Sequence, residues 1–372
     1  MAIPELLNDL VDEILYRVPA TSLKRLRVTC KRWNRLFKED RKFASEHRDK
    51  AAKEFLFLIM TEKRRICPLS ITNRDDVTPL PSVEVKRELS LPDSSNNSRQ
   101  FEMYKVSHCD GLLICVRESI SGPTECQYEI VVWNPFTGQT RWIEAGNGWE
   151  QFITFVLGYN NNKSSCSQRS YKILCFSPSG RETEIYDLNS SVSWRTPAGD
   201  LTPPGWTAVM AEEAIVSVKG NSYFFAKEKS KPQLGLSLLR FDFSTEKSSL
   251  FVPLPYQHPR TEIWVTSKID DDSTKAAVSW NKVFALDLSP DLQITFLVNF
   301  LFDEDKKVAV CCERWMDYDD SLCTDKIYIL GEDNQVSEFG FDPIDPFLIR
   351  GLRPFPLNYV PSLVQIELPA GD

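Results

Sequence analysis

The spacing of apolar residues changes once along this chain, near residue 55, and that change constrains the fold more than any other feature. Before it, apolar residues recur every three or four positions, the pattern of helices that bury one face. After it, they alternate or cluster in short runs between turn residues, such as FLFLIM (55–60), LLICV (112–116), ITFVLGY (153–159) and YKILCF (171–176). No helix-length amphipathic pattern separates these runs. We therefore expect a small helical unit followed by an all-β body.

The β body contains a repeat of about fifty residues. Its unit is a strand that ends in an acidic or amide residue, a short polar turn and a second strand, anchored on Asn134, Asp187, Asp242, Asp287 and Glu332. The anchors are 53, 55, 45 and 45 residues apart, which is the length of one four-stranded propeller blade. About six blades fit, and SLVQIEL (362–368) is expected to pair with FLFLIM and close the ring. The alternative is a pair of β-sandwiches.

Charge divides the chain at the same place. Residues 1–54 carry a net charge of +4 and the remainder −12, within a total of −8 over 372 residues. Such asymmetry indicates two units with different partners, and an acidic body is a poor binder of nucleic acid or anionic membranes. The chain has no run of eighteen apolar residues and begins with an acidic segment. We expect no membrane span, no secretory signal, and an intracellular location in the nucleus, the cytoplasm or both.

Metal and cofactor chemistry has little support in the sequence. The ten cysteines include no C-x-x-C pair, and only three histidines are present. Most of the thiols are expected to be buried, and all of them reduced. The acidic residues Asp317, Asp319, Asp320 and Asp325, with residues 270–272, lack the spacing of a calcium loop and are expected to be solvated. We therefore expect no metal and no cofactor.

Three short amphipathic helices are expected in the first fifty residues. The first carries the apolar stripe of LVDEILYRV (10–18) and ends at Pro19, the second carries Leu23 and Leu26, and the third carries Trp33. The stretch 40–54 that follows is highly charged. Three such helices bury too little surface to be stable alone, so this unit is expected to need a partner surface.

The string LLNDLVDEILYRVPATSLKRLRVTCKRWNRLF (6–37) resembles the F-box, whose common form is LP-x-D-L-x-x-E-I-L-x-R-V-P, then S-L-x-x-L-R, then C-K-x-W. The positions in step are Asp9, Leu10, Glu13, Ile14, Leu15, Arg17, Val18, Pro19, Ser22, Leu23, Leu26, Arg27, Cys30, Lys31 and Trp33. The family's Leu-Pro opening reads Leu6-Leu7 here. The resemblance implies an F-box over residues 1–50 that docks on a Skp-type adaptor. The expected adaptor-binding residues are Leu6, Leu7, Leu10, Ile14, Leu15, Leu23 and Leu26.

Basic residues between 24 and 42 leave a second interpretation of this unit open, a helix-turn-helix that reads DNA. They fall on several faces of two helices, which favours a solvated surface. We expect no nucleic-acid partner.

Motifs of the β body resemble the plant F-box-associated domain, regarded as a kelch-like β-propeller. In order they are CDGLLIC (109–115), VVWNPFTGQTRWI (131–143), FVLGY (155–159), EIYDLNSSVSWRT (184–196), VSVKGNSYFFA (216–226) and LLRFDFSTEKSSLFVPLP (238–255). The resemblance implies that residues 51–372 form this domain. Asp110-Gly111 suits a type I′ hairpin. The aromatic residues Trp133, Trp142, Tyr186 and Trp194 are expected to pack blades together rather than to form a ligand cage.

Catalytic patterns are weak. The chain lacks G-x-S-x-G, Walker A, H-E-x-x-H and G-x-G-x-x-G motifs. His108 and Cys109 are neighbours on an expected strand and so point to opposite faces, as do Cys311 and Cys312. A carboxylate pair on a propeller face, as in glycoside hydrolases, is the remaining enzyme interpretation.

Together these features predict a small α-helical F-box followed by an all-β domain, a six-bladed kelch-like β-propeller. The resemblance implies a non-catalytic substrate-recognition subunit of a Skp-cullin-F-box ubiquitin ligase. Its partners would be a Skp-type adaptor, a cullin reached through that adaptor, and an unknown substrate protein. The alternative is a stand-alone propeller scaffold that is not coupled to a ligase.

Overall fold

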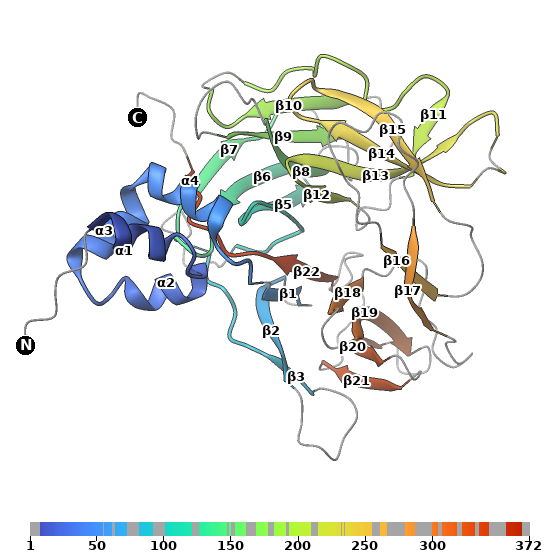
Figure 1. Cartoon of the computed structure of the whole chain (residues 1–372). Helices are drawn as coiled ribbons and strands as arrows, with labels where there is room; N and C mark the ends of the chain where they lie inside the picture. Colours follow the sequence, from blue (N-terminus) through green and yellow to red (C-terminus); the bar gives the residue numbers. More distant parts are fainter. Residues whose placement is uncertain are drawn as a thin grey trace, which may run out of the picture.

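A computed structural model shows four helices at the N-terminus, and the elements that follow them among the described residues are strands (Figure 1). It describes residues 8–54, 56–61, 64–72, 82–91, 101–120, 126–146, 149, 153–160, 169–177, 182–190, 193–209, 215–231, 233, 235–254, 261–265, 280–286, 300–303, 307–317, 322–331, 335–341 and 355–366. None of the helices in these ranges has the length and apolar character needed to cross a bilayer.

The helical unit, residues 8–50, has its own apolar core. Its helices are α1 (Asn8–Leu15), α2 (Ala20–Leu26), α3 (Lys31–Glu39) and α4 (Arg41–Lys50). The core contains Leu15, Leu23, Phe37 and Phe43, and two residues of the β domain, Phe136 and Leu363, complete it. The unit is therefore stabilised in part by the β domain, in line with its small size.

Helix α4 corrects the expectation of three helices. The Asp40 carboxylate caps it by accepting a hydrogen bond from the Phe43 backbone N–H at 2.8 Å. Phe43 is buried between Tyr16 and Phe37, with ring centroids 4.9 and 5.3 Å away. One turn later the buried His47 ring lies 2.8 Å from the Val18 carbonyl through Nε2. Charged residues at the exposed positions of α4 hid this narrow apolar stripe in the sequence.

The strands form five blades and one two-stranded sheet. Blade 1 contains β1 (Leu56–Met60), β2 (Ile66–Thr72), β3 (Ser82–Val85) and β22 (Phe355–Tyr359). Blade 2 contains β4 (Lys105–Cys109), β5 (Leu112–Ile120), β6 (Cys126–Trp133) and β7 (Thr140–Glu144). Blade 3 contains β8 (Thr154–Asn160), β9 (Ser170–Phe176) and β10 (Thr183–Asp187).

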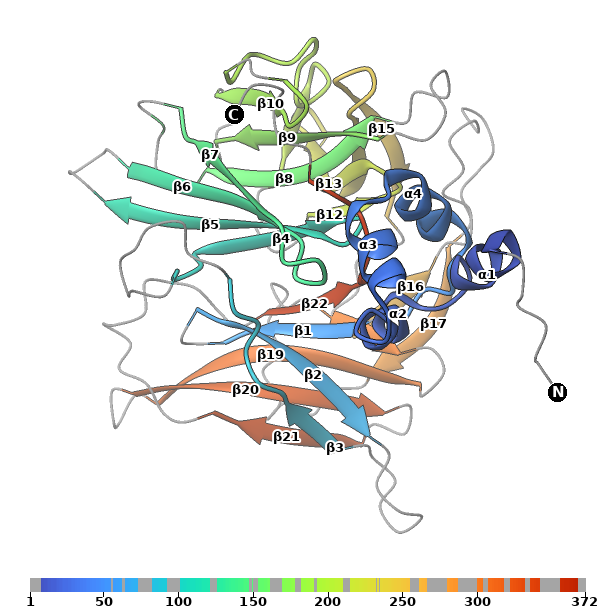
Figure 2. The same ribbon diagram turned by 90° about the vertical axis from the view of Figure 1, so that its left-hand side faces the viewer.

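Blade 4 contains β11 (Trp206–Ala208), β12 (Val216–Val218), β13 (Asn221–Glu228), β14 (Ser237–Asp242) and β15 (Lys247–Pro253). The two-stranded sheet follows, with β16 (Thr261–Val265) and β17 (Asn281–Leu286). Blade 5 contains β18 (Phe300–Asp303), β19 (Val308–Asp317), β20 (Leu322–Gly331) and β21 (Val336–Gly340). All pairings between these strands are antiparallel (Figure 2).

Apolar clusters hold neighbouring blades face to face. Separate clusters join blades 1 and 2, blades 2 and 3, blades 3 and 4, and blades 1 and 5. The contact between the first and last blades makes the arrangement circular, which confirms the prediction of a propeller and excludes separate sandwiches. The β16–β17 sheet lies where a further blade is expected. The count of six blades stays a prediction, because the residues that flank this sheet lie outside the described ranges.

The ring closes by a different strand from the one that we expected. β22 pairs with β1, from Leu56 opposite Tyr359 to Met60 opposite Phe355. The segment SLVQIEL was expected to supply this strand, but residues 362–366 form no strand. Instead Leu363 packs into the helical core, while Val364 and Ile366 pack between blades 2 and 3. An alternating apolar pattern therefore reflects two packing surfaces here rather than a sheet.

The predicted hairpin at Asp110-Gly111 is confirmed, and it contacts the C-terminal segment. Both residues have positive φ, 56° and 80°, as a type I′ turn between β4 and β5 requires. A side-chain carbon at Gly111 would lie only 2.2 Å from Oγ of Ser362. The Ser362 hydroxyl donates a hydrogen bond to the Asp110 carbonyl at 2.8 Å. Glycine at position 111 is therefore required by conformation and by space.

These two requirements can be separated by comparing two glycines. Gly138 has a similar φ of 82°, but nothing lies within 4 Å of an added carbon there. We expect Gly138→Ala to cost about 1 kcal/mol of unfolding free energy, from backbone strain alone. Gly111→Ala should cost a further 1–3 kcal/mol, roughly, because Ser362 must move. Denaturant unfolding of both variants measures this, and equal losses would contradict the close contact.

The predicted packing role of the large aromatic residues is confirmed. Trp133 is buried between blades 1 and 2, and Trp142 packs against the same cluster. Trp194 packs edge-on against Trp149, with ring centroids 4.9 Å apart, and also contacts Tyr186. These rings join neighbouring blades.

Candidate functional site

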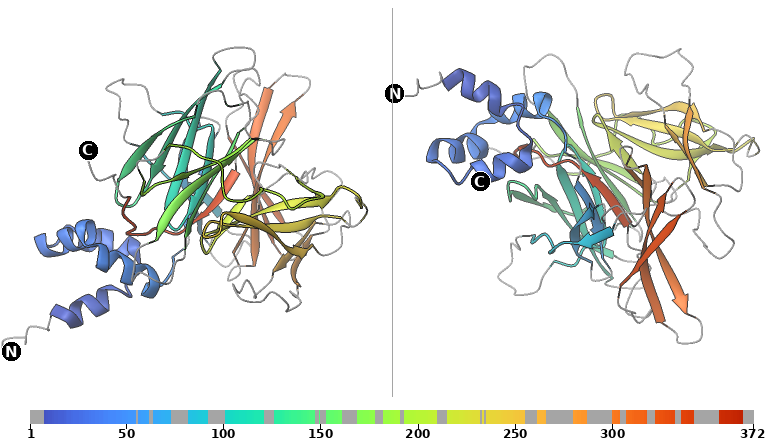
Figure 3. Two further views of the ribbon diagram at one scale, coloured as in Figure 1. Left: turned by 90° about the horizontal axis from the view of Figure 1, so that it is seen from above. Right: turned by 60° about the horizontal axis from the view of Figure 1, so that its bottom comes forward.

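Helix α1 lies on the side of the helical unit away from the sheets (Figure 3), and it carries two exposed apolar side chains. Leu10 and Ile14 lie one turn apart and are 51% and 56% exposed. Val28, after α2, is 86% exposed. Two large apolar side chains exposed one turn apart on so small a unit, Leu10 and Ile14, mark an interaction surface. Sequence reasoning missed Val28, because it lies in a turn rather than on the helical stripe.

Five of the seven predicted adaptor-binding residues lie in described parts of the helical unit. Leu10 and Ile14 are exposed as a contact surface requires, whereas Leu6 and Leu7 lie outside the described residues. Leu15 and Leu23 are 4% and 0% exposed and belong to the helical core, so a direct adaptor contact at these two positions stays a prediction. Leu26 packs partly against the same core. These three residues therefore stabilise the helical unit. The apolar stripe of a short helix contains both core positions and exposed positions, and the sequence pattern does not separate the two.

The helical unit is attached to the propeller by the C-terminal segment 360–366. The Asn134 side chain donates hydrogen bonds to the carbonyls of Ser362, at 3.1 Å, and Val364, at 2.7 Å. The Gln365 side chain donates to the Lys38 carbonyl at 2.9 Å, at the end of α3. Segment 360–366 thus lies between blade 2 and the helices, and it holds the exposed face of α1 in a defined orientation.

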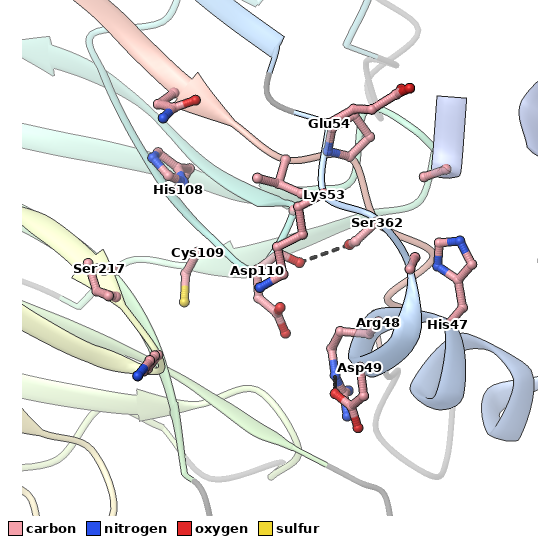
Figure 4. A pocket seen from close by; sticks show the side chains of 18 of the residues that line it. His47, Arg48, Asp49, Lys53, Glu54, His108, Cys109, Asp110, Ser217 and Ser362 are labelled. Atoms are coloured by element: carbon pink, nitrogen blue, oxygen red, sulfur yellow. Dashed lines mark hydrogen bonds and ion pairs between the residues drawn. The ribbon is translucent and has the colours of Figure 1, made fainter. Parts of the chain in front are cut away.

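A cleft of about 710 Å³ opens between the helical unit and the propeller (Figure 4). One wall comes from α2, α4 and residues 51–54, and the other comes from the ends of β4, β12 and β22. The lining includes an ion pair between Arg169 and Asp110, in which Nη1 lies 2.6 Å from Oδ2. The same guanidinium stacks 4.1 Å from the Tyr159 ring centroid, and Tyr171 donates its hydroxyl to Asp110.

The cleft contains His108 and Cys109, but their state does not suit nucleophilic catalysis. Burial lowers the pKa of His108 to about 4 and raises the pKa of the Cys109 thiol. At pH 7 the imidazole is neutral and the sulfur is protonated, whereas a thiolate is the reactive form.

Metal ligands are equally poorly arranged in the part of the chain that the structure describes. It contains no group of three His, Cys, Asp or Glu side chains that could hold an ion. Of the acidic residues considered above, Asp325 is fully buried on β20, so the expectation that it is solvated was wrong. Asp319, Asp320 and residues 270–272 lie outside the described residues.

The chain combines a helical unit, which exposes Leu10 and Ile14, with a β-propeller to which segment 360–366 attaches it. Comparison with known families agrees. A family model of the F-box domain matches residues 3–45, and one of the F-box associated beta propeller domain matches residues 56–261 and 258–366. The chain therefore belongs to the F-box proteins that carry an F-box associated β-propeller domain.

Two curated relatives show the same organisation over their whole length. F-box protein ETP1 of Arabidopsis thaliana is 56% identical over 415 residues, covering 100% of this chain and 98% of its own. F-box protein ETP2 of the same plant is 45% identical over 399 residues, covering 99% and 97%. The sequence-based recognition of both parts is thereby confirmed.

Proposed function

We propose that this protein is the substrate-recognition subunit of a Skp-cullin-F-box ubiquitin ligase. Residues 1–50 would bind a Skp-type adaptor and through it a cullin, while residues 51–372 would hold a substrate protein. The observation that carries the proposal is the exposure of Leu10 and Ile14, one turn apart on α1, beside the buried helical core of Leu15, Leu23, Phe37 and Phe43. The F-box family supports the choice of adaptor.

In this proposal the chain itself performs no chemistry. It raises the effective concentration of a substrate lysine near the ubiquitin-loaded enzyme that other subunits carry. The attachment of the helices through segment 360–366 supports this function, because a defined orientation limits where a bound substrate can lie. An intracellular location, in the nucleus or the cytoplasm, follows from the same proposal.

Replacement of Ile14 by Asp tests adaptor binding. A charge in an apolar contact that adaptor binding would bury should cost about 2–4 kcal/mol, a loss of affinity of thirtyfold or more. Because Ile14 is 56% exposed in the free chain, the fold should persist. Isothermal titration with a purified Skp-type adaptor measures the affinity, and circular dichroism checks the fold.

Val336→Asp is the matched control, because Val336 is 39% exposed on β21, far along the chain from the helical unit. It should leave adaptor affinity unchanged. Unchanged affinity of the Ile14→Asp variant would instead favour the alternative of a propeller scaffold that is not coupled to a ligase.

A further inference from the structure

The cleft between the helical unit and the propeller has features that adaptor binding does not use. Its lining includes four cationic side chains, Arg48, Lys53, Arg169 and Lys219, although the chain as a whole is acidic. These cations come from α4, from residues 51–54, from the residue before β9 and from the turn after β12. Arg48 and Lys53 are near neighbours in the sequence, but Arg169 and Lys219 are far from them and from each other, so only the fold brings all four to one cavity.

Two of the guanidinium groups approach a single carboxylate oxygen. Oδ1 of Asp49 lies 3.1 Å from Nε of Arg48 and 3.8 Å from Nη2 of Arg169. The two arginine side chains are 13% and 22% exposed, whereas the Asp49 side chain is 58% exposed. The two largely buried guanidinium groups therefore direct N–H donors toward one point at the cleft surface. In the free protein the exposed Asp49 carboxylate accepts them, and another oxyanion could take its place.

The other acidic residues of the cleft already have partners. Asp110 is bound by Arg169 and Tyr171, and Glu54 accepts a hydrogen bond from the Thr21 hydroxyl. Lys53, which lies on the same wall as Arg48, extends into the cleft toward Asp110 (Figure 4). The described lining thus carries four cationic side chains but only three acidic ones, Asp49, Glu54 and Asp110. An oxyanion that enters the cleft would therefore meet a net positive charge.

The cleft also contains polar groups suited to a ligand with mixed hydrogen bonding. Oδ1 of Asn358, on β22, is buried without a hydrogen-bond partner among the described residues. A buried acceptor left unpaired costs free energy, so this part of the lining is not fully satisfied in the free protein. The neutral His108 ring on β4 offers one donor and one acceptor. A cavity of about 710 Å³ is within the size range of small-molecule sites.

We propose that this cleft binds a small molecule that carries a carboxylate or phosphate group, with Arg48, Arg169 and Lys53 as its oxyanion contacts. The Asp49 carboxylate occupies part of this position in the free protein and competes with the ligand. Because the site is built from both the helical unit and the propeller, a bound ligand stabilises their junction. This inference does not depend on ligase coupling.

Titration calorimetry of the purified full-length chain tests the proposal, with citrate and inorganic phosphate as separate probes at low ionic strength. We expect saturable binding of at least one probe, weakened about tenfold or more by Arg48→Gln and about threefold or more by Lys53→Gln. Asp49→Asn should tighten binding about threefold or more, because it removes the competing carboxylate.

The matched control is Glu46→Gln, which makes the same charge change on α4 at a residue that does not line the cleft. It should alter affinity less than about twofold, by screened long-range charge alone. Equal effects of Asp49→Asn and Glu46→Gln would overturn the proposal, and so would wild-type affinity in Arg48→Gln. Binding of a polyglutamate peptide without binding of either probe would identify a peptide groove instead. Absence of binding to all three probes would also overturn it.

Discussion

Deletion of residues 355–372 is expected to abolish cooperative folding of the β domain. The deletion removes β22, and with it the pairing that completes blade 1 along β1. It also exposes the cluster between blades 1 and 2, where Tyr359 is buried and Leu357 packs. An open ring presents an unpaired strand edge and uncovered apolar surface, whose combined cost exceeds the roughly 5–15 kcal/mol that stabilises a domain.

Two shorter deletions distinguish the closure of the propeller by β22 from the attachment of the helical unit by segment 360–366. Removal of 367–372 leaves β22 and the packed residues up to Ile366, so stability should be unchanged. Removal of 361–372 keeps β22 but loses Leu363, Val364 and Ile366, each worth about 1.5–3 kcal/mol when buried. We expect this variant to retain a destabilised propeller with helices that proteases cleave readily. Thermal unfolding and limited proteolysis give the comparison, and a wild-type melting temperature after deletion of 355–372 would contradict closure by β22.

Glu246→Gln is expected to destabilise the junction of blades 3 and 4 by about 3 kcal/mol. The carboxylate is buried in the turn between β14 and β15, and it accepts hydrogen bonds from Lys172 at 2.8 Å and Arg195 at 2.7 Å. The Lys172 side chain is only 10% exposed. Removing the anion leaves this ammonium buried without its counter-charge, which is the costly way to break a buried ion pair.

The same carboxylate makes stability depend on acid. The Arg195 hydrogen bond, helped by Lys172, lowers the pKa of Glu246 to about 2, from an ordinary value of 4.5. A pKa that folding lowers means that the charged form stabilises the fold, fully above about pH 4.5. This contribution is lost as the pH falls from about 4.5 toward 2. The loss should be smaller in Glu246→Gln, because glutamine does not titrate.

Glu338→Gln provides the matched control. Glu338 pairs with Lys326 at 3.3 Å, but its side chain is 56% exposed, so its replacement should cost less than about 1 kcal/mol. Denaturant unfolding at pH 7 and pH 3 compares both variants with the wild type. An equal, small loss in the two variants would show that the buried cluster contributes no more than a surface pair.

Local patterns were sufficient to predict the class of each part of the chain. The spacing of apolar residues, the turn residues and the fifty-residue repeat can all be seen in the sequence alone. The hairpin at Asp110-Gly111 likewise needs only two adjacent residues that adopt positive φ. Helix α4 was missed because its buried stripe, Phe43, Ala44 and His47, is narrow and lies among charges. The apolar stripe of α1 and α2 was found, but its division into exposed Ile14 and buried Leu23 was not.

The sequence by itself determined the helical N-terminus, the all-β propeller and the likeness to F-box proteins. These properties depend on the periodicity of apolar residues and on short motifs, which are local features of the sequence. Only the tertiary structure decided which strand closes the ring, since β22 and SLVQIEL have similar apolar content and differ in what lies beside them. The cationic cleft also depends on the tertiary structure. Arg48 and Arg169 are far apart along the chain, and their approach to Asp49 results from the packing of α4 against the propeller, which no local pattern encodes.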